Sequence, residues 1–343
     1  MAQASYDVTI ERPSSFAPSP RAGRWSLLLN TLRAIGSALV TLCILSALLF
    51  VAMNFHSGDD FARNVLGHAA TQQQVHAYAV SHHLDDPLPQ RYIQWASGFV
   101  RGDWGVSWLT GFPVGPDILQ RLPRTMLLAG LALPLGSLIG VSLGAFAAVR
   151  IGSRSDLAIT LATAILAGLP TFVIAISLLI AFAVTFQVVP LGSFALAYGS
   201  PDQVAEAFIL PTVTLALAMV PQTARITRAA VRDVLTAPYV QAAVLRGLPF
   251  RTVLWTHAVR NAVGPIANII GLEAIELLAG VIVVENVFSF PGIGQALLTA
   301  VSAGDVQSVE TIVMIMGITF VSITLITDLV VLYFNPRLRL ATR

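Results

Sequence analysis

Long stretches without a charged residue dominate this chain and limit what it can fold into. A helix that crosses a membrane needs about 20 consecutive, mostly apolar residues. Six stretches fit that requirement, and they lie at about Ala34–Asn54, Thr125–Val149, Leu157–Val188, Phe208–Ala224, Asn261–Val284 and Thr311–Phe334. The sequence therefore predicts an all-α polytopic membrane protein with six transmembrane helices.

The composition excludes the main classes of soluble protein. Hydrophobic residues make up 55% of the 343 residues and charged residues only 11%, whereas soluble domains are about one quarter charged. The single cysteine, Cys43, lies inside an apolar stretch, so an intrachain disulfide and a thiolate metal cluster are both excluded. A soluble enzyme, a disordered chain and a disulfide-stapled secreted domain do not fit these values.

The positions of the arginines predict the orientation of the chain. With the N-terminus inside, 15 of the 20 basic residues, all of them arginine, fall on cytoplasmic segments. The other five lie in one long outer loop, residues 59–124, and long loops cross the membrane largely regardless of charge. We expect residues 1–33 to form a disordered cytoplasmic tail, residues 34–339 the six-helix domain, and residues 340–343 a second cytoplasmic tail.

Two of the predicted spans carry a local signal. Gly136, Gly140 and Gly144 follow one another at intervals of four residues, so one face of the second span lacks side chains and another helix can approach closely. In the third span, Pro170 removes a backbone hydrogen bond and is expected to kink the helix. A kink of this kind suits a protein that opens and closes, although kinks also occur in static bundles.

The cytoplasmic segment between the fourth and fifth spans, residues 225–260, is expected to fold into helices under the membrane. A first helix carries a basic stripe of arginines and ends at Pro238. A short second helix, Tyr239–Arg246, ends at Gly247 in the left-handed capping conformation. Small residues at the centre of this second helix, Ala242 and Ala243, leave room for a partner groove to approach.

Two acidic residues lie inside the fifth span. Glu273 and Glu276 are three residues apart, so they share one helix face. An unpaired carboxylate at that depth costs about 2.5 to 3.5 kcal/mol, so both should face protein or water. One hypothesis is that they line a transport cavity and attract a peptide amino terminus or another cation. The alternative is that they lie near the inner interface, or pair with Arg260 or a residue of another chain.

The predicted outer segments carry aromatic residues and histidines. Trp95, Trp104 and Trp108 in the long outer loop either anchor at the membrane interface or contact a partner protein. The residues from Phe288 to Gly294 form either a re-entrant turn that closes the outer mouth or a plain tight turn. The spacing of the outer histidines fits no compact metal site, so no metal is expected at His56, His68, His76, His82 and His83.

Several ordered motifs resemble the dipeptide, oligopeptide and nickel permease family of ATP-binding-cassette importers. Gln241-Ala242-Ala243-x-x-x-Gly247 resembles the EAA signature of these permeases, with Gln in place of the usual Glu. The resemblance covers about Arg33 to Arg339. Further matching motifs begin at Leu84, Arg101, Arg121, His257, Gly271, Glu285 and Asn335.

The resemblance implies an architecture and a set of partners. It implies a type I importer permease in a bacterial inner membrane, with both termini cytoplasmic. A second, similar permease chain, two ATPase subunits and an extracytoplasmic binding protein are expected as partners, and no nucleic acid is. No Walker motif occurs in this sequence, so ATP and Mg²⁺ are expected on the ATPase partners and no cofactor on this chain.

The resemblance also implies roles for particular residues. It makes the second cytoplasmic helix the coupling helix that inserts into the ATPase, with Tyr239, Gln241, Ala242, Ala243, Arg246 and Gly247 as contact residues. Cavity candidates are Glu273, Glu276 and Pro170, and outer-gate candidates are Phe288, Phe290, Pro291 and Gly292.

The substrate and the transport class retain alternatives at this point. Peptide is the expected substrate, and nickel, glutathione or a sugar would fit the same architecture. A proton-coupled secondary transporter would use the same acidic residues without an ATPase. An intramembrane enzyme is a third reading, but the sequence lacks a nucleophile motif and a metalloprotease His pair.

Overall fold

The structure is a computed structural model that describes residues 22–54, 70–81, 86–108, 110–186, 200–249, 252 and 260–334. Within these ranges every regular element is a helix. The elements are α1 (Ala22–Asn54), α3 (Gln72–Ser81), α4 (Leu88–Arg101), α5 (Val114–Val149), α6 (Arg154–Ala167), α7 (Thr171–Leu178), the π-helical η1 (Leu179–Thr185), α9 (Pro201–Leu235), α10 (Pro238–Leu245), α12 (Arg260–Val287), α13 (Ile293–Ala303) and α14 (Val306–Phe334).

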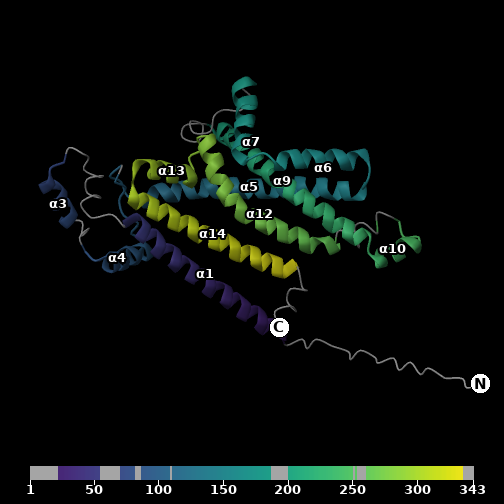
Figure 1. Ribbon diagram of the computed structural model, residues 1–343, viewed down its shortest axis with the longest axis horizontal. Helices are drawn as coiled ribbons and strands as arrows, with labels where there is room; N and C mark the ends of the chain where they lie inside the picture. Colours follow the sequence, from purple (N-terminus) through teal and green to yellow (C-terminus); the bar gives the residue numbers. More distant parts are fainter. Residues whose placement is uncertain are drawn as a thin grey trace, which may run out of the picture.

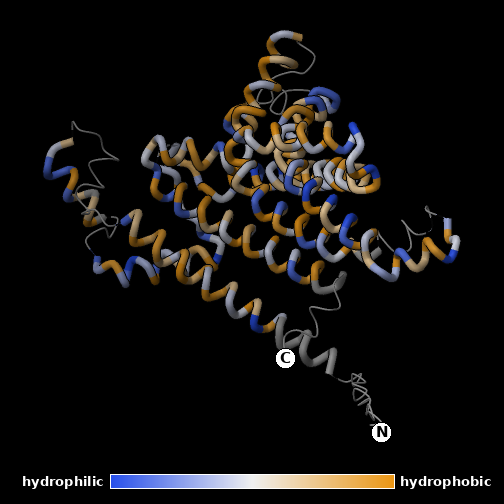
Figure 2. The backbone as a smooth tube through the Cα atoms, turned by 45° about the vertical axis from the view of Figure 1, so that its right-hand side comes forward, coloured by the Kyte–Doolittle hydropathy of each residue, from blue (hydrophilic) through white to orange (hydrophobic). Residues whose placement is uncertain are grey.

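Five of these helices, α1, α5, α9, α12 and α14, are long and apolar enough to cross a membrane. A sixth span results if α6 and α7–η1 count as one broken crossing. The long helices form one bundle, with α13 and α4 at one end and α10 at the opposite end (Figure 1). Hydrophobic residues run along the long helices, while hydrophilic ones gather at α3 and around α10 (Figure 2). This arrangement confirms the predicted all-α polytopic architecture.

The predicted glycine face on the second span is confirmed, and its partner is α9. A side-chain carbon added at Gly136 would lie 2.9 Å from the carbonyl oxygen of Ala216, and one at Gly140 would lie 2.7 Å from the Cβ of Thr223. Gly144 is equally close to the backbone of α9 at Ala224. Because these glycines carry no side chains on the face of α5 toward α9, the two helices pack closely and form the most extensive helix pair of the bundle.

The apolar core lies where α5, α9 and α12 meet. Leu128, Leu215 and Val281 are almost fully buried there. Phe208 and Phe290 close the core toward α13, with ring centroids 4.9 Å apart in an edge-to-face arrangement. This packing fixes α9 and α12, the two helices that carry the charged residues of the site, against the same side of α5.

The third predicted span is broken rather than kinked. α6 ends at Ala167, Pro170 precedes α7, and the two helices meet at 101°. Pro170 disfavours a helical conformation at Leu169 and cannot donate a hydrogen bond back into α6. Pro170 correctly predicted where the helix is distorted. The predicted kink was too small, because the structure has two separate helices at this point.

Three predicted boundaries differ from the structure. α1 begins at Ala22, so residues 22–33 are helical where a disordered tail was expected, because the Leu-rich segment there continues the helix. The predicted outer loop contains α3, α4 and the first turns of α5. The fourth span does not end at Ala224: α9 continues to Leu235 because nothing before Pro238 breaks the helix. Its arginines therefore belong to a long membrane helix, not to a separate helix.

Candidate functional site

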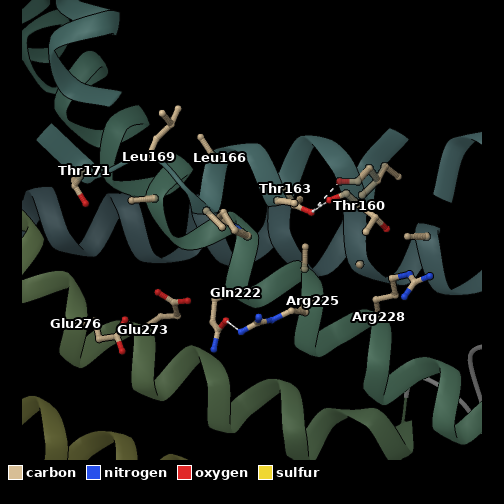
Figure 3. A pocket seen from close by; sticks show the side chains of 18 residues that line it. Thr160, Thr163, Leu166, Leu169, Thr171, Gln222, Arg225, Arg228, Glu273 and Glu276 are labelled. Atoms are coloured by element: carbon tan, nitrogen blue, oxygen red, sulfur yellow. Dashed lines mark hydrogen bonds between the residues drawn. The ribbon is translucent and has the colours of Figure 1, made fainter. Parts of the chain in front are cut away.

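A cavity of about 530 Å³ lies between α5, α6, α9 and α12 and is open on one side, since several of its lining residues, Arg225 and Glu276 among them, are exposed (Figure 3). Its walls combine small residues of α5 with threonines of α6 and α7. Four ionisable side chains also line it, two from α9 and two from α12: Arg225, Arg228, Glu273 and Glu276. Ionisable residues within membrane spans are expensive to bury and mark functional pathways, which makes this cavity the candidate site.

Both glutamates of the fifth span line the cavity from α12. Glu273 is 5% exposed, and its Oε1 is buried without a hydrogen-bond partner among the described residues. Glu276 follows one turn later and is exposed toward the cavity. The alternative pairing with Arg260 stays a prediction, because the side chain of Arg260 lies outside the part of the chain that the structure describes.

Pro170 has a different place from the two glutamates. It does not line the cavity, whereas its neighbours Leu169 and Thr171 do. Its contribution is therefore indirect: by separating α6 from α7 it allows residues of both helices to face the same space.

The arginines of α9 reach the cavity because that helix continues past Ala224. Arg228 donates two hydrogen bonds, of 2.7 and 2.9 Å, to the carboxylate of Asp156 at the start of α6. Asp156 is itself buried and also accepts a hydrogen bond from the backbone N–H of Gly152. Arg225, one turn earlier on α9, donates to the side chain of Gln222. Sequence reasoning missed these arginines as cavity residues, although their spacing without a helix breaker was a usable signal.

The short helix predicted over Tyr239–Arg246 is present as α10 (Pro238–Leu245) at one end of the bundle, and its coupling role stays a prediction (Figure 1). The residue after its C-cap, Gly247, has φ +81°, as predicted. Leu248 donates to the carbonyl of Ala243 at 3.3 Å and Gly247 to that of Val244 at 2.9 Å, which is the Schellman pattern. The C-cap thereby fixes where the chain leaves the helix.

Most of the surface of α10 is open to a partner. Val240 alone is buried, against the end of α9. Most other side chains of the helix are exposed, including apolar ones: Tyr239 is 50%, Val244 49% and Leu245 88% exposed. Gln241, Ala242 and Arg246 are exposed as well, and Ala243 is half-buried.

The turn between α12 and α13 is organised around a buried carboxylate that sequence reasoning did not single out. Glu285 is fully buried and accepts hydrogen bonds from Thr125 Oγ1 at 2.6 Å and from the N–H of Gly294 at 2.7 Å. The N–H of Ile293 in turn donates to Thr125 Oγ1 at 2.9 Å. These bonds tie the start of α13 to α5.

The predicted gate residues lie on this turn. Phe288 and Phe290 point into the apolar core, and both are at most 3% exposed. A side chain at Gly292 would overlap the Glu285 carboxylate, and one at Gly294 would lie 2.6 Å from the Cα of Ile282. The segment from Phe288 to Gly294 is therefore a tightly packed turn, and a gating role for it stays a prediction.

The outer segment before α5 is anchored by polar and aromatic contacts. Asp305 accepts hydrogen bonds from the hydroxyls of Ser107 and Ser308 and from the backbone N–H groups of Trp108 and Ser308. Burial raises the pKa of the Asp305 carboxyl, but these hydrogen bonds outweigh burial and hold the pKa below its ordinary value.

Tryptophans of the predicted outer loop pack within the protein. Trp95 and Trp104 belong to one row of aromatic rings that joins α1 to α4 and to the loop before α5; its members are Phe50, Tyr92, Trp95, Phe99 and Trp104. Among the outer histidines, His76 lies in α3, and the other four lie outside the described residues.

Comparisons with known proteins identify the family. Residues 140–340 match the family described as binding-protein-dependent transport system inner membrane component, and residues 27–129 match the N-terminal region of such components. The chain belongs to this family of inner membrane transport components. It is a multi-pass membrane protein of a binding-protein-dependent transport system, as the resemblance of its motifs implied.

Two relatives show the range of named substrates. A "Probable peptide ABC transporter permease protein" of Sinorhizobium fredii is 34% identical over 312 residues, which cover 90% of this chain and 98% of the relative. A "Glutathione transport system permease protein" of Escherichia coli K12 is 31% identical over 300 residues, which cover 87% of this chain and 95% of the relative. Both similarities extend over nearly the whole chain.

Proposed function

We propose that this chain is the permease subunit of an ATP-binding-cassette importer and forms half of a translocation pathway for peptides. The observation that carries the proposal is the cavity between α5, α6, α9 and α12, where four ionisable side chains line a space between otherwise apolar helices. Membership of the transport family and similarity to a relative named as a peptide permease support it. Glutathione, itself a small peptide, is the second candidate substrate because another relative carries that name.

The proposal includes partners that this chain lacks. A similar permease chain would supply the other half of the pathway, and an extracytoplasmic binding protein would deliver the substrate. Two ATPase subunits would bind ATP and Mg²⁺ on the cytoplasmic side, where both termini of this chain would also lie. This chain would then have no catalytic activity of its own. Twelve of the 20 arginines still fall on the segments assigned to the cytoplasm when Arg225, Arg228 and Arg232 are counted with α9, and this bias supports the orientation.

In this proposal α10 is the coupling helix. Its exposed apolar side chains, Tyr239, Val244 and Leu245, suit insertion into a groove of an ATPase. Since α10 follows α9 after only two residues, a displacement of α10 would act directly on a helix that lines the cavity. Rigid-body motion of this kind is how transport domains alternate access around a fixed site.

The α12–α13 turn is proposed as part of the outer gate. It lies at the end of the bundle opposite α10 (Figure 1). Its aromatic residues, Phe288 and Phe290, cover the core at that end, and Pro291 and Gly292 lead the chain into α13.

Reconstitution tests the proposed function. The chain would be placed in vesicles with its candidate permease partner and ATPases, and ATP hydrolysis and uptake would be measured with and without binding protein loaded with tripeptide. Peptide-dependent stimulation of both is expected. Stable assembly without peptide stimulation would contradict the peptide assignment and move the search to glutathione, nickel or sugars. Failure of every ATPase to assemble would contradict the importer itself.

A further inference from the structure

The charged side chains of the cavity are separated into an acidic and a basic end. Glu273 and Glu276 lie together on α12, while Arg225 and Arg228 lie farther along α9, with Gln222 between the two groups (Figure 3). All five positions are on helix faces that line the same space. The cavity therefore presents opposite charges to whatever occupies it.

A positively charged group bound at the acidic end would stabilise the two carboxylates there. Glu273 is only 5% exposed, and its Oε1 has no hydrogen-bond partner among the described residues. A buried carboxylate without a partner is unstable as an ion, and a second carboxylate one turn away, Glu276, adds repulsion. A cationic group bound between the two side chains would relieve both penalties.

At the basic end, one of the two arginines forms no ion pair with a described residue. Arg228 is neutralised by its ion pair with Asp156, at 2.7 Å. Arg225 donates to the uncharged amide of Gln222 and makes no ion pair with any residue of the described ranges. Its guanidinium is therefore the positive group available to an anionic ligand, and a planar guanidinium suits a carboxylate especially well.

The helix register gives the distance between the two ends. Gly280 of α12 lies level with Leu215 of α9, because a carbon added at Gly280 would be 3.4 Å from the Leu215 side chain. From that level, Glu276 is four residues, Glu273 seven and Arg225 ten toward the same end, so along the bundle Arg225 lies about 9 Å from Glu276 and about 4.5 Å from Glu273. An extended chain spans about 3.5 Å per residue, so the terminal charges of a dipeptide or tripeptide lie about 7 to 10 Å apart.

We propose that this cavity binds a short peptide as a zwitterion, with its ammonium group at Glu273 and Glu276 and its carboxylate at Arg225. The proposal rests on the proposed function and adds to it the residues that bind the peptide and the orientation in which they hold it. A divalent cation would use the glutamates and leave Arg225 without a role, so the two-ended charge favours a peptide over a metal ion.

Cysteine labelling tests whether the cavity has an acidic and a basic end, and it requires no measurement of transport. Cys43 is the only cysteine of the chain, so Cys43→Ala gives a clean background for Thr171→Cys or Thr160→Cys in the assembled importer. In Figure 3, Thr171 lies toward the glutamates and Thr160 toward the arginines. We expect the ratio of cationic to anionic methanethiosulfonate reaction rates to be about tenfold higher at position 171 than at position 160. Adding Glu273→Gln and Glu276→Gln should remove most of this difference, and equal ratios at both positions would overturn the proposal.

Uptake of trialanine by the complete importer tests the binding orientation. Glu273→Gln with Glu276→Gln, and separately Arg225→Gln, should each reduce the initial uptake rate about tenfold or more. Controls are Glu206→Gln and Arg154→Gln, which each remove one charge of the corresponding sign from an exposed position outside the cavity. Co-purification of the ATPases checks that each variant assembles.

The two failures are distinguishable in this design. An unaltered importer that takes up no peptide would contradict the proposed function, whatever the labelling shows. An importer that takes up trialanine equally well with the cavity variants and the controls would overturn the zwitterion site alone.

Discussion

At the scale of single residues, the most consequential side chain outside the cavity is Glu285. It holds the α12–α13 turn against α5 through Thr125 and the N–H groups of Gly294 and Gln295. Removing the acceptor in Glu285→Leu leaves these buried donors unsatisfied, and we expect a loss of about 2 to 4 kcal/mol of stability. Thermal unfolding of the purified protein in detergent measures the loss. Glu206→Gln, at an exposed position of α9, should change the unfolding temperature little, and an equal unfolding temperature for both variants would refute the role of Glu285.

Asp305 gives a pH-dependent prediction at the same scale. Its hydrogen bonds hold the pKa of the carboxyl below the ordinary value despite burial. A carboxyl with a lowered folded-state pKa stabilises the protein above the unfolded value, about pH 3.9, and the stabilisation disappears as pH falls through the folded value. Asp305→Asn should therefore be less stable than the unaltered protein at pH 7, and the difference should shrink below about pH 4. Unfolding curves over pH 3 to 8 check this, and a difference that is constant with pH would contradict it.

At the scale of helices, the contact between α5 and α9 depends on glycines in the second span. Gly144→Ala would push a methyl group into the backbone of α9, so we expect a destabilisation of about 1 to 3 kcal/mol. Gly130 provides a matched control in the same helix, because no atom lies within 4 Å of a carbon added there. Gly130→Ala should be neutral or slightly stabilising through helix propensity. Thermal unfolding of both variants measures the difference. Similar decreases in unfolding temperature for the two variants would contradict the role of the close contact between α5 and α9.

The same helices show what could be read from the sequence and what could not. The spacing of Gly136, Gly140 and Gly144 predicted a close helix contact because backbone approach needs small residues locally. It did not identify α9 as the partner, since partners are chosen by the packing of the whole bundle. The prediction that the fourth span ends at Ala224 and that Arg225 and Arg228 lie on a separate helix was wrong, because no helix breaker lies between these arginines and Pro238 and α9 continues to Leu235.

The carboxylates show the same limit for the candidate site. Glu273 and Glu276 stood out because a charge inside an apolar stretch is rare and expensive. Glu285 lies at the end of such a stretch, where a charge is ordinary, and its burial arises from the return of α13 over the end of α12. Its partner Thr125 lies 160 residues away in the sequence, and its partner Gly294 lies nine residues away. No local sequence pattern links Glu285 to either of them.

At the scale of the whole molecule, the proposed coupling requires a rigid connection from the ATPase to the cavity. Gly247 ends α10 with φ +81°, a conformation that costs other residues about 1 to 2 kcal/mol, and a side chain there would meet no atom within 4 Å. Gly247→Val therefore changes the backbone at the end of α10 without a steric clash in the fold. We expect the reconstituted importer carrying this variant to lose about tenfold or more of its peptide-stimulated ATP hydrolysis and uptake together, because the contact with the ATPase is displaced.

Gly111 separates this effect from backbone strain in general. It has φ +71° and open space around it, like Gly247, but it lies in the loop before α5, at the opposite end of the bundle from α10. Gly111→Val imposes a comparable local strain and should leave ATPase co-purification and peptide-stimulated hydrolysis near those of the unaltered importer. If both valine variants lost activity equally, strain on the fold would explain the result and α10 would have no special role in coupling. If only Gly247→Val lost activity, the end of α10 would be the site where the movement of the ATPase is transmitted to the permease. From there α9, which precedes α10 directly, would transmit the movement to Arg225 and the cavity.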